Sequence, residues 1–515
     1  MSGLVEYPDT GITVAELPRR DQPIAANGDC VLAFVGRTLR GPVNEPVEID
    51  GMAAFQRHFG APWEGSLLGP AVEQYFSHGG RRAVVVRVAN GARRARLVLP
   101  GDGGELTLEA CHPGAAEVLR VAVDYDGIAG ADPVRFNLTA QRLAGPGGRI
   151  TDQEIHGDVS VAAADNRFIT DILAGSQIVR VAGDVPPVRP AVTADCNAGK
   201  RHAGYRLIGD AGSDGAPLTD YDLIGSQREA TGLFALAAAE CFDVLYAPPA
   251  SFASSPGPAY VLAAERYCRE RGALLLVDPP ATLEPAERRL PLRSAHIVAY
   301  YPRVVVRRRR ADGLTPVGGA LAGLLACGAA GAGPAFAFSD ARRRLSRSYT
   351  LPNGVGGIEC HSLRRQGFNP LTATPAGRLA LADECTASGG AQDGPVTLAA
   401  MRLSLVIRRA VVDGTRWAAF EPGGEDVWRR IEAQVAQFLD EVAAAGWFGR
   451  DAAASWFVHC DATTNRRVGD DDNALHFLVG FVPAGQSEPV VLAVTQRPDG
   501  AECRPAAFVR DVAGA

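Results

Sequence analysis

The chain has 515 residues, of which 47% are hydrophobic and 21% charged, and its formal net charge is −6. This composition is typical of a folded protein with two to four domains, and it excludes a disordered or fibrous chain. The small negative charge gives no electrostatic reason to expect nucleic acid, and no apolar run reaches the roughly 18 residues that cross a membrane. The first residues lack the basic and apolar regions of a signal peptide, so we expect a protein made and kept in the cytoplasm.

The first predicted range, residues 1–25, is an N-terminal linker arm. Its segment Gly11–Leu17 has the alternation of a strand, lies between Pro8 and Pro18, and has no evident hairpin partner beside it. An unpaired strand exposes backbone hydrogen-bonding groups. We therefore expect this strand to pair elsewhere, within its own chain or with another chain.

Residues 26–96 are predicted to form the N-terminal part of the core. Two continuous apolar strands, Cys30–Val35 and Ala83–Val88, flank two short helices, Gly51–Phe59 and Pro70–Ser77. Strands of this kind are typical of a sheet that is buried on both faces.

Two inserted domains are expected to follow, at residues 97–190 and 191–334. The first has short alternating runs between Gly- and Asp-rich turns, which predicts a β-rich domain. In the second, the strands Phe242–Ala247 and Leu274–Val277 flank the helix Gly257–Arg271, and this order predicts crossovers and a parallel sheet. The fold class is therefore α/β with an α+β core, in several domains.

Residues 335–485 are predicted to complete the core, and residues 486–515 to form a C-terminal strand and linker arm. The apolar run Met401–Ile407 predicts a strand. Glu425–Ala445 has apolar residues three or four apart and acidic residues in its first turn, which predicts an amphipathic helix. Three further strands are expected at Ser455–Asp461, Ala474–Pro483 and Pro489–Gln496.

No pattern for catalysis, a cofactor or a metal stands out. The ten cysteines are scattered without a C-x-x-C pair, so we interpret them as small buried hydrophobic residues. The glycine-rich stretches Gly209–Gly215 and Gly328–Gly333 lack the Gly-Lys-Ser/Thr of a phosphate loop, and Gly199-Lys200 is followed by Arg201. Asp470–Asn473 could bind a hard cation, but a solvated acidic turn is favoured.

Three further motifs have competing interpretations. His459, Cys460 and Asp461 are neighbours on one predicted strand, so their side chains point to opposite faces and cannot form a relay. Asp278 ends a strand where α/β enzymes bind ligands, but a strand-ending turn is favoured. Arg307–Arg310 either contacts an acidic neighbour or flanks the strand as a solvated turn.

A series of motifs, in chain order, resembles the contractile tail sheath proteins of myophages, pyocins and extracellular injection systems. In the N-terminal part they are Ala33–Gly36, Arg40–Asn44, Phe59-Gly60, Tyr75–Gly80 and Val84–Val88. In the C-terminal part they are Trp417-x-x-Phe420-Glu421-Pro422, Trp428-x-x-Ile431, Phe438-Leu439, Gly446-Trp447-Phe448, Phe457–Asp461 and Val479-Gly480-Phe481-x-Pro483. Two stretches depart from the family pattern, Gly333–Phe336 and Leu381–Thr386.

The resemblance implies a structural protein and not an enzyme, with no cofactor. It implies a homo-oligomer, a helical sleeve of stacked six-subunit rings around an inner tube protein, that ends on baseplate and tail terminator proteins. Contraction of such a sleeve drives the tube through a target envelope. It implies neither nucleic acid nor membrane insertion.

Two kinds of site residue follow from this resemblance. The subunit linker strands would include residues of both arms and of the sheet between them: Ile12, Thr13, Val14, Ala15, Leu478, Val491, Ala493, Phe508 and Val509. The N-terminal arm would add to the open edge of the Ala474–Gln496 sheet in one neighbour, and the C-terminal arm to that of another. Arg429 and Arg430 are candidate contacts with the tube, although a solvated helix face is an equal alternative. The competing functions are a soluble α/β enzyme and a ligand-binding protein with an unidentified site.

Overall fold

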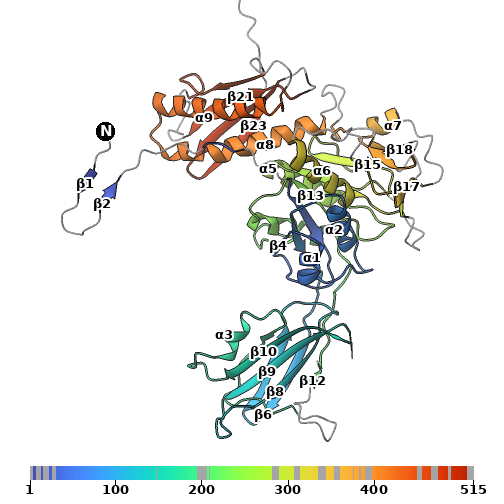
Figure 1. Ribbon diagram of the computed structural model, residues 1–515, viewed down its shortest axis with the longest axis vertical. Coiled ribbons are helices and arrows are strands. Elements are labelled where there is room, and N and C mark those ends of the chain that lie inside the picture. The colour runs from blue at the N-terminus through green and yellow to red at the C-terminus, as the bar shows by residue number, and fades with distance from the viewer. Residues whose placement is uncertain are drawn as a thin grey trace, which may run out of the picture. The chain divides into compact units, whose positions relative to one another are not determined.

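The computed structural model describes residues 4–6, 13–15, 23–25, 30–145, 148–193, 206–207, 209–280, 289–306, 314–333, 344–352, 360–374, 376–381, 384–388, 397–448, 455–465, 474–484, 486 and 489–506 (Figure 1). The chain divides into two compact units. The large unit comprises residues 30–327 and 338–395, and the C-terminal unit comprises residues 1–29, 328–337 and 396–515.

An eight-stranded sheet forms the centre of the large unit, in the order β19-β18-β15-β14-β13-β3-β5-β4. The strands are β3 (Leu32–Gly36), β4 (Pro46–Ile49), β5 (Ala83–Arg87), β13 (Val244–Tyr246), β14 (Leu274–Val277), β15 (Ile297–Tyr301), β18 (Asn369–Ala373) and β19 (Leu379–Leu381). The six inner strands are parallel to one another, and only the edge strands β4 and β19 run antiparallel. The expected parallel sheet is therefore confirmed, and it takes strands from residues 26–96, 191–334 and 335–485 alike.

Helices cover this sheet because its central strands are apolar on both faces. They are α1 (Met52–Phe59), α2 (Leu68–Ser77), α4 (Asp220–Ile224), the 3-10 helix η1 (Gly232–Ala238), α5 (Pro258–Arg271), α6 (Gly318–Ala332) and α7 (Cys360–Arg365). A Cβ atom on Gly319 or Gly323 of α6 would lie 2.1 or 2.4 Å from the carbonyl oxygen of Ala71 or Tyr75 in α2. The glycines of α6 therefore allow α2 to approach closely.

A β-sandwich lies within the large unit, between β5 and β13 in the chain. One sheet has the order β10-β9-β8-β12 and the other β11-β7-β6. The strands are β6 (Arg96–Gly101), β7 (Gly104–Ala110), β8 (Val118–Asp124), β9 (Arg135–Leu143), β10 (Ile150–Ser160), β11 (Val179–Val181) and β12 (Arg206–Leu207), with the short helix α3 (Ile169–Leu173). Its apolar core is a separate cluster, so the expected β-rich domain is confirmed.

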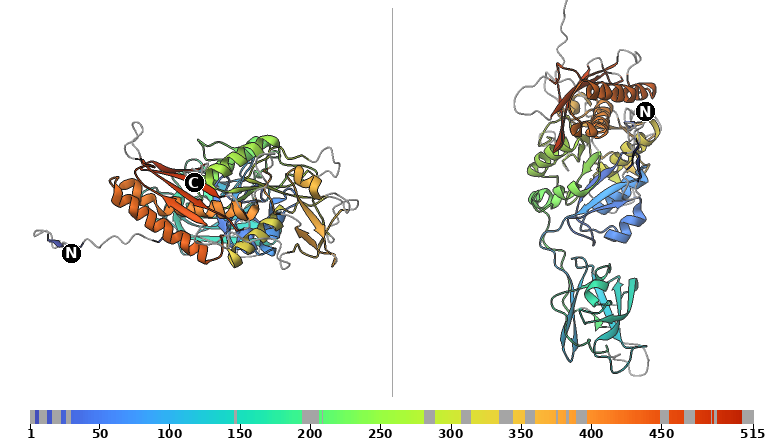
Figure 2. Two further views of the ribbon diagram at one scale, coloured as in Figure 1. Left: turned by 90° about the horizontal axis from the view of Figure 1, so that it is seen from above. Right: turned by 90° about the vertical axis from the view of Figure 1, so that its left-hand side faces the viewer.

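The C-terminal unit is a four-stranded antiparallel sheet with helices against one face. The strands are β20 (Trp456–His459), β21 (Leu475–Phe481), β22 (Val490–Arg497) and β23 (Gly500–Pro505), in that order. Helices α8 (Leu398–Gly414) and α9 (Glu425–Ala444), joined by the 3-10 helix η3 (Arg416–Phe420), share one core with the sheet. Figure 2 shows these helices in orange beside the red strands.

The prediction of a strand at Met401–Ile407 is wrong, because this run lies inside α8. Leu403, Ile407 and Val411 are fully buried and four residues apart, which places them on one face of a helix. The Thr397 hydroxyl accepts a hydrogen bond from the Ala400 N–H and caps the helix start. A short apolar run does not by itself distinguish a strand from a buried helix.

Three small features complete the fold. The strands β1 (Leu4–Glu6) and β2 (Thr13–Ala15) pair with each other, as do β16 (Val305–Val306) and β17 (Tyr349–Thr350). Of the described cysteines, Cys30, Cys268 and Cys460 are buried, whereas Cys327 is exposed and the others are half-buried, so the expectation of uniform burial is too simple. No helix in the described ranges is both long and apolar enough to cross a membrane.

Candidate assembly surfaces

In the C-terminal unit, strand β23 occupies the position beside β22 at which the sequence suggests an open sheet edge. Strand β23 pairs with β22 along its whole length, from Leu492 opposite Pro505 to Arg497 opposite Gly500. The Ala506 N–H continues the ladder with a 2.8 Å hydrogen bond to the Val491 carbonyl. The open edge expected for the Ala474–Gln496 sheet is therefore not at β22, because the chain folds back through a tight turn and β23 covers that strand.

The linker-strand candidates in this sheet consequently lie in its interior. Leu478 of β21 is opposite His459 on one side and Ala493 on the other. Val491 and Ala493 lie on β22, between β21 and β23. Along the described part of the chain, β23 is an edge strand with no further strand beside it. An incoming strand at this side of the sheet would pair with β23.

The N-terminal arm contains a hairpin. Strand β1 pairs antiparallel with β2, with Val5 opposite Val14 and Glu6 opposite Thr13. The prediction of a strand without a neighbouring partner is wrong, since Leu4–Glu6 is a partner too short to give a recognisable pattern. Thr13, Val14 and Ala15 form β2, whereas Ile12 lies outside the described residues.

Among the described residues of the arm, Ile24 is buried in the C-terminal unit. Ile24 is 4% exposed and belongs to the core shared by α8, α9 and the sheet. A Cβ atom on Gly414, at the end of α8, would lie 2.6 Å from the Ile24 side chain. At the other end of the chain, the candidates Phe508 and Val509 lie outside the described residues.

The two candidate tube contacts on α9 have different surroundings. The Arg429 side chain is 73% exposed and pairs with Asp426 one turn earlier in the helix. The Arg430 guanidinium lies 4.1 Å from the centre of the Trp417 ring and 3.9 Å from the Glu421 carboxylate. Trp417 is held in turn by a 2.9 Å hydrogen bond from its indole N–H to the Gln434 side chain. Arg430 is therefore part of the packing of η3 on α9, whereas Arg429 faces solvent.

The carboxylate of Asp278, the residue after β14, is held by hydrogen bonds from within the protein. Its carboxylate accepts hydrogen bonds from the Tyr246 hydroxyl at 2.5 Å and from the Gly318 N–H at 3.3 Å, where α6 begins. Burial raises the pKa of Asp278, although Arg303 and these hydrogen bonds oppose the shift. The Arg303 guanidinium donates to the carbonyls of Pro279, Phe252 and Ser254. The chain's own groups thus fill this end of the sheet.

The other chemical candidates do not come together. Cys460 is buried, and burial raises the pKa of its thiol to about 12, while Asp461 faces solvent and accepts hydrogen bonds from the Thr463 and Thr464 N–H groups. Lys200, Arg307–Arg310 and Asp470–Asn473 lie outside the described residues. In the ranges that are described, no group of three or more His, Cys, Asp or Glu side chains could hold a metal ion.

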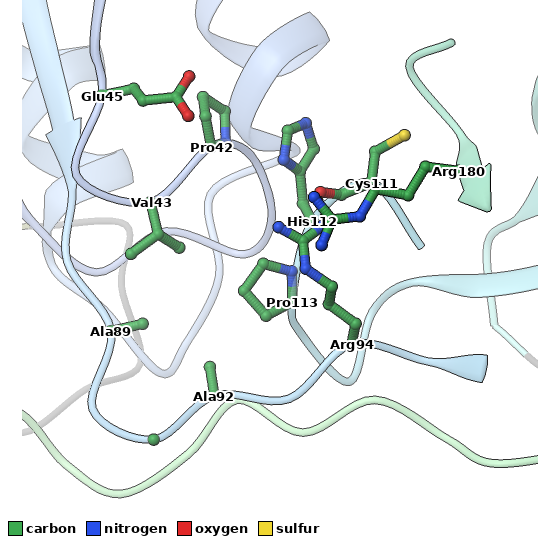
Figure 3. A pocket seen from close by; sticks show the side chains of 11 residues that line it. Pro42, Val43, Glu45, Ala89, Ala92, Arg94, Cys111, His112, Pro113 and Arg180 are labelled. Atoms are coloured by element: carbon green, nitrogen blue, oxygen red, sulfur yellow. Dashed lines mark hydrogen bonds between the residues drawn. The ribbon is translucent and has the colours of Figure 1, made fainter. Parts of the chain in front are cut away.

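A basic pocket that the sequence does not reveal lies where the sandwich joins the α/β part of the large unit. It encloses about 290 Å³ and is lined by Pro42, Val43, Glu45, Ala89, Gly91, Ala92, Arg94, Cys111, His112, Pro113 and Arg180. Figure 3 shows Arg94, Arg180 and His112 close together, with Glu45 apart from them. Its residues come from four separate segments of the chain, so no local pattern marks it.

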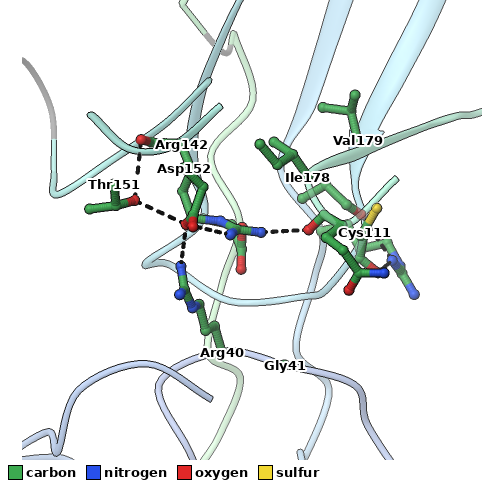
Figure 4. Close-up of polar contacts among 12 residues, drawn as sticks. Arg40, Gly41, Cys111, Arg142, Thr151, Asp152, Ile178 and Val179 are labelled. Atoms are coloured by element: carbon green, nitrogen blue, oxygen red, sulfur yellow. Dashed lines mark hydrogen bonds and ion pairs between the residues drawn. The ribbon is translucent and has the colours of Figure 1, made fainter. Parts of the chain in front are cut away.

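A network of ion pairs lies at the same junction (Figure 4). Arg142 of β9 donates to Glu117 at 2.9 Å, to Asp152 at 2.8 Å and to the Gln177 carbonyl at 2.7 Å. Arg40, in the loop after β3, donates to the same Asp152 at 3.1 Å. Asp152 therefore connects the sandwich to the α/β part of the large unit.

The comparisons with known proteins identify the fold. Neither a protein-family model nor a curated protein matches the sequence. A sheath tail protein from Listeria innocua is similar over 92% of this chain and 96% of its own, with a TM-score of 0.61 and 14% identity. A sheath tail protein from Desulfitobacterium hafniense is similar over 94% of this chain and 99% of its own, with a TM-score of 0.56 and 14% identity. A chain of the contracted helical sheath of the anti-feeding prophage is similar over 98% of this chain and 100% of its own, with a TM-score of 0.51 and 13% identity. The chain has the fold of sheath tail proteins along nearly its whole length.

Proposed function

We propose that this protein is the structural subunit of a contractile tail sheath. It assembles as stacked six-subunit rings around an inner tube, bounded by baseplate and terminator proteins, and contracts to drive the tube through a target envelope. The observation that carries this proposal is the shared fold over more than nine-tenths of both chains, because an isolated shared domain would leave large parts unmatched. The role is structural and not enzymatic, and the subunit is made in the cytoplasm before it joins a phage tail or a similar particle.

Subunits in this polymer are linked by strand addition. We infer that the β1–β2 hairpin of one subunit adds to the β23 edge of a neighbour, while the C-terminal arm joins another neighbour. Backbone hydrogen bonds then join the subunits without requiring a particular side-chain match. Ala15 and Ile24 are nine positions apart in the sequence, so at about 3.3–3.6 Å per extended residue the hairpin can lie up to roughly 30 Å from its anchor. An isolated two-stranded hairpin is only marginally stable, which favours its addition to a larger sheet.

Negative-stain microscopy of the overproduced full chain tests the function directly. We expect hollow tubes with sixfold end views. A protein that stays monomeric at every concentration that can be reached, also when it is produced with its tube protein, would rule the proposal out.

Deletion of residues 1–20 tests the linkage separately. This variant keeps Ile24, so we expect a soluble, folded monomer by size-exclusion chromatography and circular dichroism that no longer forms tubes. Deletion of residues 1–3 is the matched control, because it leaves both strands of the hairpin in place and should still form tubes. An insoluble or unfolded product from the longer deletion would show that the arm completes its own subunit.

A further inference from the structure

Among the described residues around the pocket at the base of the sandwich, arginines outnumber carboxylates. Glu109 is 7% exposed and is approached by three guanidinium groups. The Nε atoms of Arg94 and Arg96 lie 3.7 and 3.5 Å from its carboxylate, and Arg180 donates to it at 2.7 Å. One carboxylate balances only one of these charges. Arg94 and Arg180 also line the pocket, whose own carboxylate is Glu45.

His112 lies in the same positive field. Burial, together with the charges of Arg142, Arg87, Arg94 and Arg40, lowers its pKa to about 4. Its imidazole is therefore neutral at pH 7, with one N–H that can donate a hydrogen bond. Arg87 does not line the pocket, but its side chain donates to the carbonyls of Gly41 and of the lining residue Pro113. The buried Arg87 Nε has no hydrogen-bond partner among the described residues.

We propose that this pocket binds a small oxyanion of the phosphate class. Guanidinium groups are suited to this chemistry, because their planar forks donate charge-assisted hydrogen bonds to tetrahedral oxyanions. Arg94 and Arg180 supply the charge, and His112 supplies a neutral donor that needs no proton uptake. The volume of about 290 Å³ far exceeds the roughly 10–15 Å³ that one water molecule needs.

The position of the pocket gives the bound anion a structural role. Pro42, Val43 and Glu45 come from the loop between β3 and β4, whereas Arg94 leads into the sandwich and His112 and Arg180 belong to it. The anion thus binds where the sandwich meets the α/β part, and it screens the repulsion between the arginines on the sandwich side. This inference is independent of the proposed function, because it rests on the large unit alone.

Calorimetric titration of the full chain with inorganic phosphate, at constant ionic strength in chloride, tests the proposal. We expect saturable binding with one site per chain. Arg180→Gln removes a pocket arginine whose side chain is 48% exposed and should weaken the affinity by about tenfold or more. Arg96→Gln is the matched control, because Arg96 contacts the same Glu109 but does not line the pocket. The phosphate affinity of this variant should differ from that of the unmodified chain by less than about threefold.

Thermal unfolding provides a second measurement for the same variants. Phosphate should raise the unfolding temperature of the unmodified chain and of Arg96→Gln, and should have little effect on Arg180→Gln. Both variants should unfold at similar temperatures in chloride, which separates lost binding from lost folding. Equal phosphate affinities for Arg180→Gln and Arg96→Gln, or no saturable binding in the millimolar range, would overturn the proposal.

Discussion

Asp152 is the residue at which the ion-pair network of the sandwich reaches the α/β part of the large unit. Burial opposes its ionisation, but the hydrogen bond from Arg142 and the charges of Arg142 and Arg40 hold its pKa below the usual value. Because the folded-state pKa is depressed, this stabilisation is present above the unfolded-state pKa of about 3.9 and is lost as pH falls through the folded-state value. The junction should therefore weaken below about pH 4.

Acid titration of the full chain followed by circular dichroism measures this effect. Asp152→Asn keeps the size of the side chain but removes its charge, so we expect lower stability at pH 7 and a flatter loss of stability below about pH 4. An acid profile for Asp152→Asn that runs parallel to that of the unmodified chain would contradict the role of the carboxylate. The Asp152 side chain is 40% exposed, so solvent screens part of the effect.

Arg429 and Arg430 illustrate what residue patterns on a helix can and cannot predict. The helical period of α9 correctly places both near its polar face. It does not reveal that the Trp417 ring covers Arg430, since that contact comes from the separate turn η3. Only Arg429 combines a charge with high exposure, and its link to Asp426 is a surface ion pair that contributes about 0–1 kcal/mol and is easily exchanged.

Charge reversal at Arg429 tests whether this residue contacts the tube. With Arg429→Glu we expect normal folding but fewer loaded particles and a higher ratio of sheath to tube protein in purified particles. Arg429→Lys keeps the charge and should behave like the unmodified chain. A normal ratio for Arg429→Glu would show that this helix face is only solvated.

At the level of elements, the sequence patterns identify the helices and strands in which the spacing of apolar residues matches the spacing of the buried positions. The apolar strands β3, β5 and β14 and the amphipathic α9 are examples. Strand β10 escapes detection because charged side chains alternate along it. Glu154, for example, accepts hydrogen bonds from the Ser176 hydroxyl and the Gln177 N–H. The pairing of β23 with β22 could not be predicted either, because strand pairing depends on register and turn geometry as well as on residue type.

The contact between α2 and α6 gives a test of packing between elements. A methyl group at residue 319 would approach the backbone of Ala71, which cannot move aside as a flexible side chain can. Gly319→Ala should therefore lower the free energy of unfolding by about 1–3 kcal/mol, seen as a lower urea midpoint. Gly130→Ala is the control, since nothing lies within 4 Å of its added methyl group, and its midpoint should be nearly unchanged. Equal midpoints for the two variants would exclude the close approach.

On the scale of the whole molecule, the β-sandwich is a module with its own core that can be deleted between two adjacent chain segments. It has its own apolar core, in which Leu106, Leu138 and Val159 are fully buried, and the chain enters and leaves it through two adjacent segments. Those segments run antiparallel, with bridges between Asn90 and Ala216, Arg93 and Ser213, and Arg96 and Asp210. The Arg96 N–H donates to the Asp210 carbonyl at 2.8 Å. Removal of the segment from residue 97 to residue 209 therefore leaves two adjacent chain ends, at Arg96 and Asp210, that a short turn can join.

Replacing residues 97–209 with a Gly-Ser turn tests whether assembly depends on the sandwich. We expect the sandwich to point outward in the proposed sheath, and the linking strands belong to the C-terminal unit, which this deletion does not touch. We expect tubes that are thinner in negative stain but have the same sixfold end views. The deletion also removes His112 and Arg180, so phosphate should no longer bind at the site proposed above. A folded variant that forms no tubes would place part of the subunit interface on the sandwich, because the arms and the β20–β23 sheet would still be present.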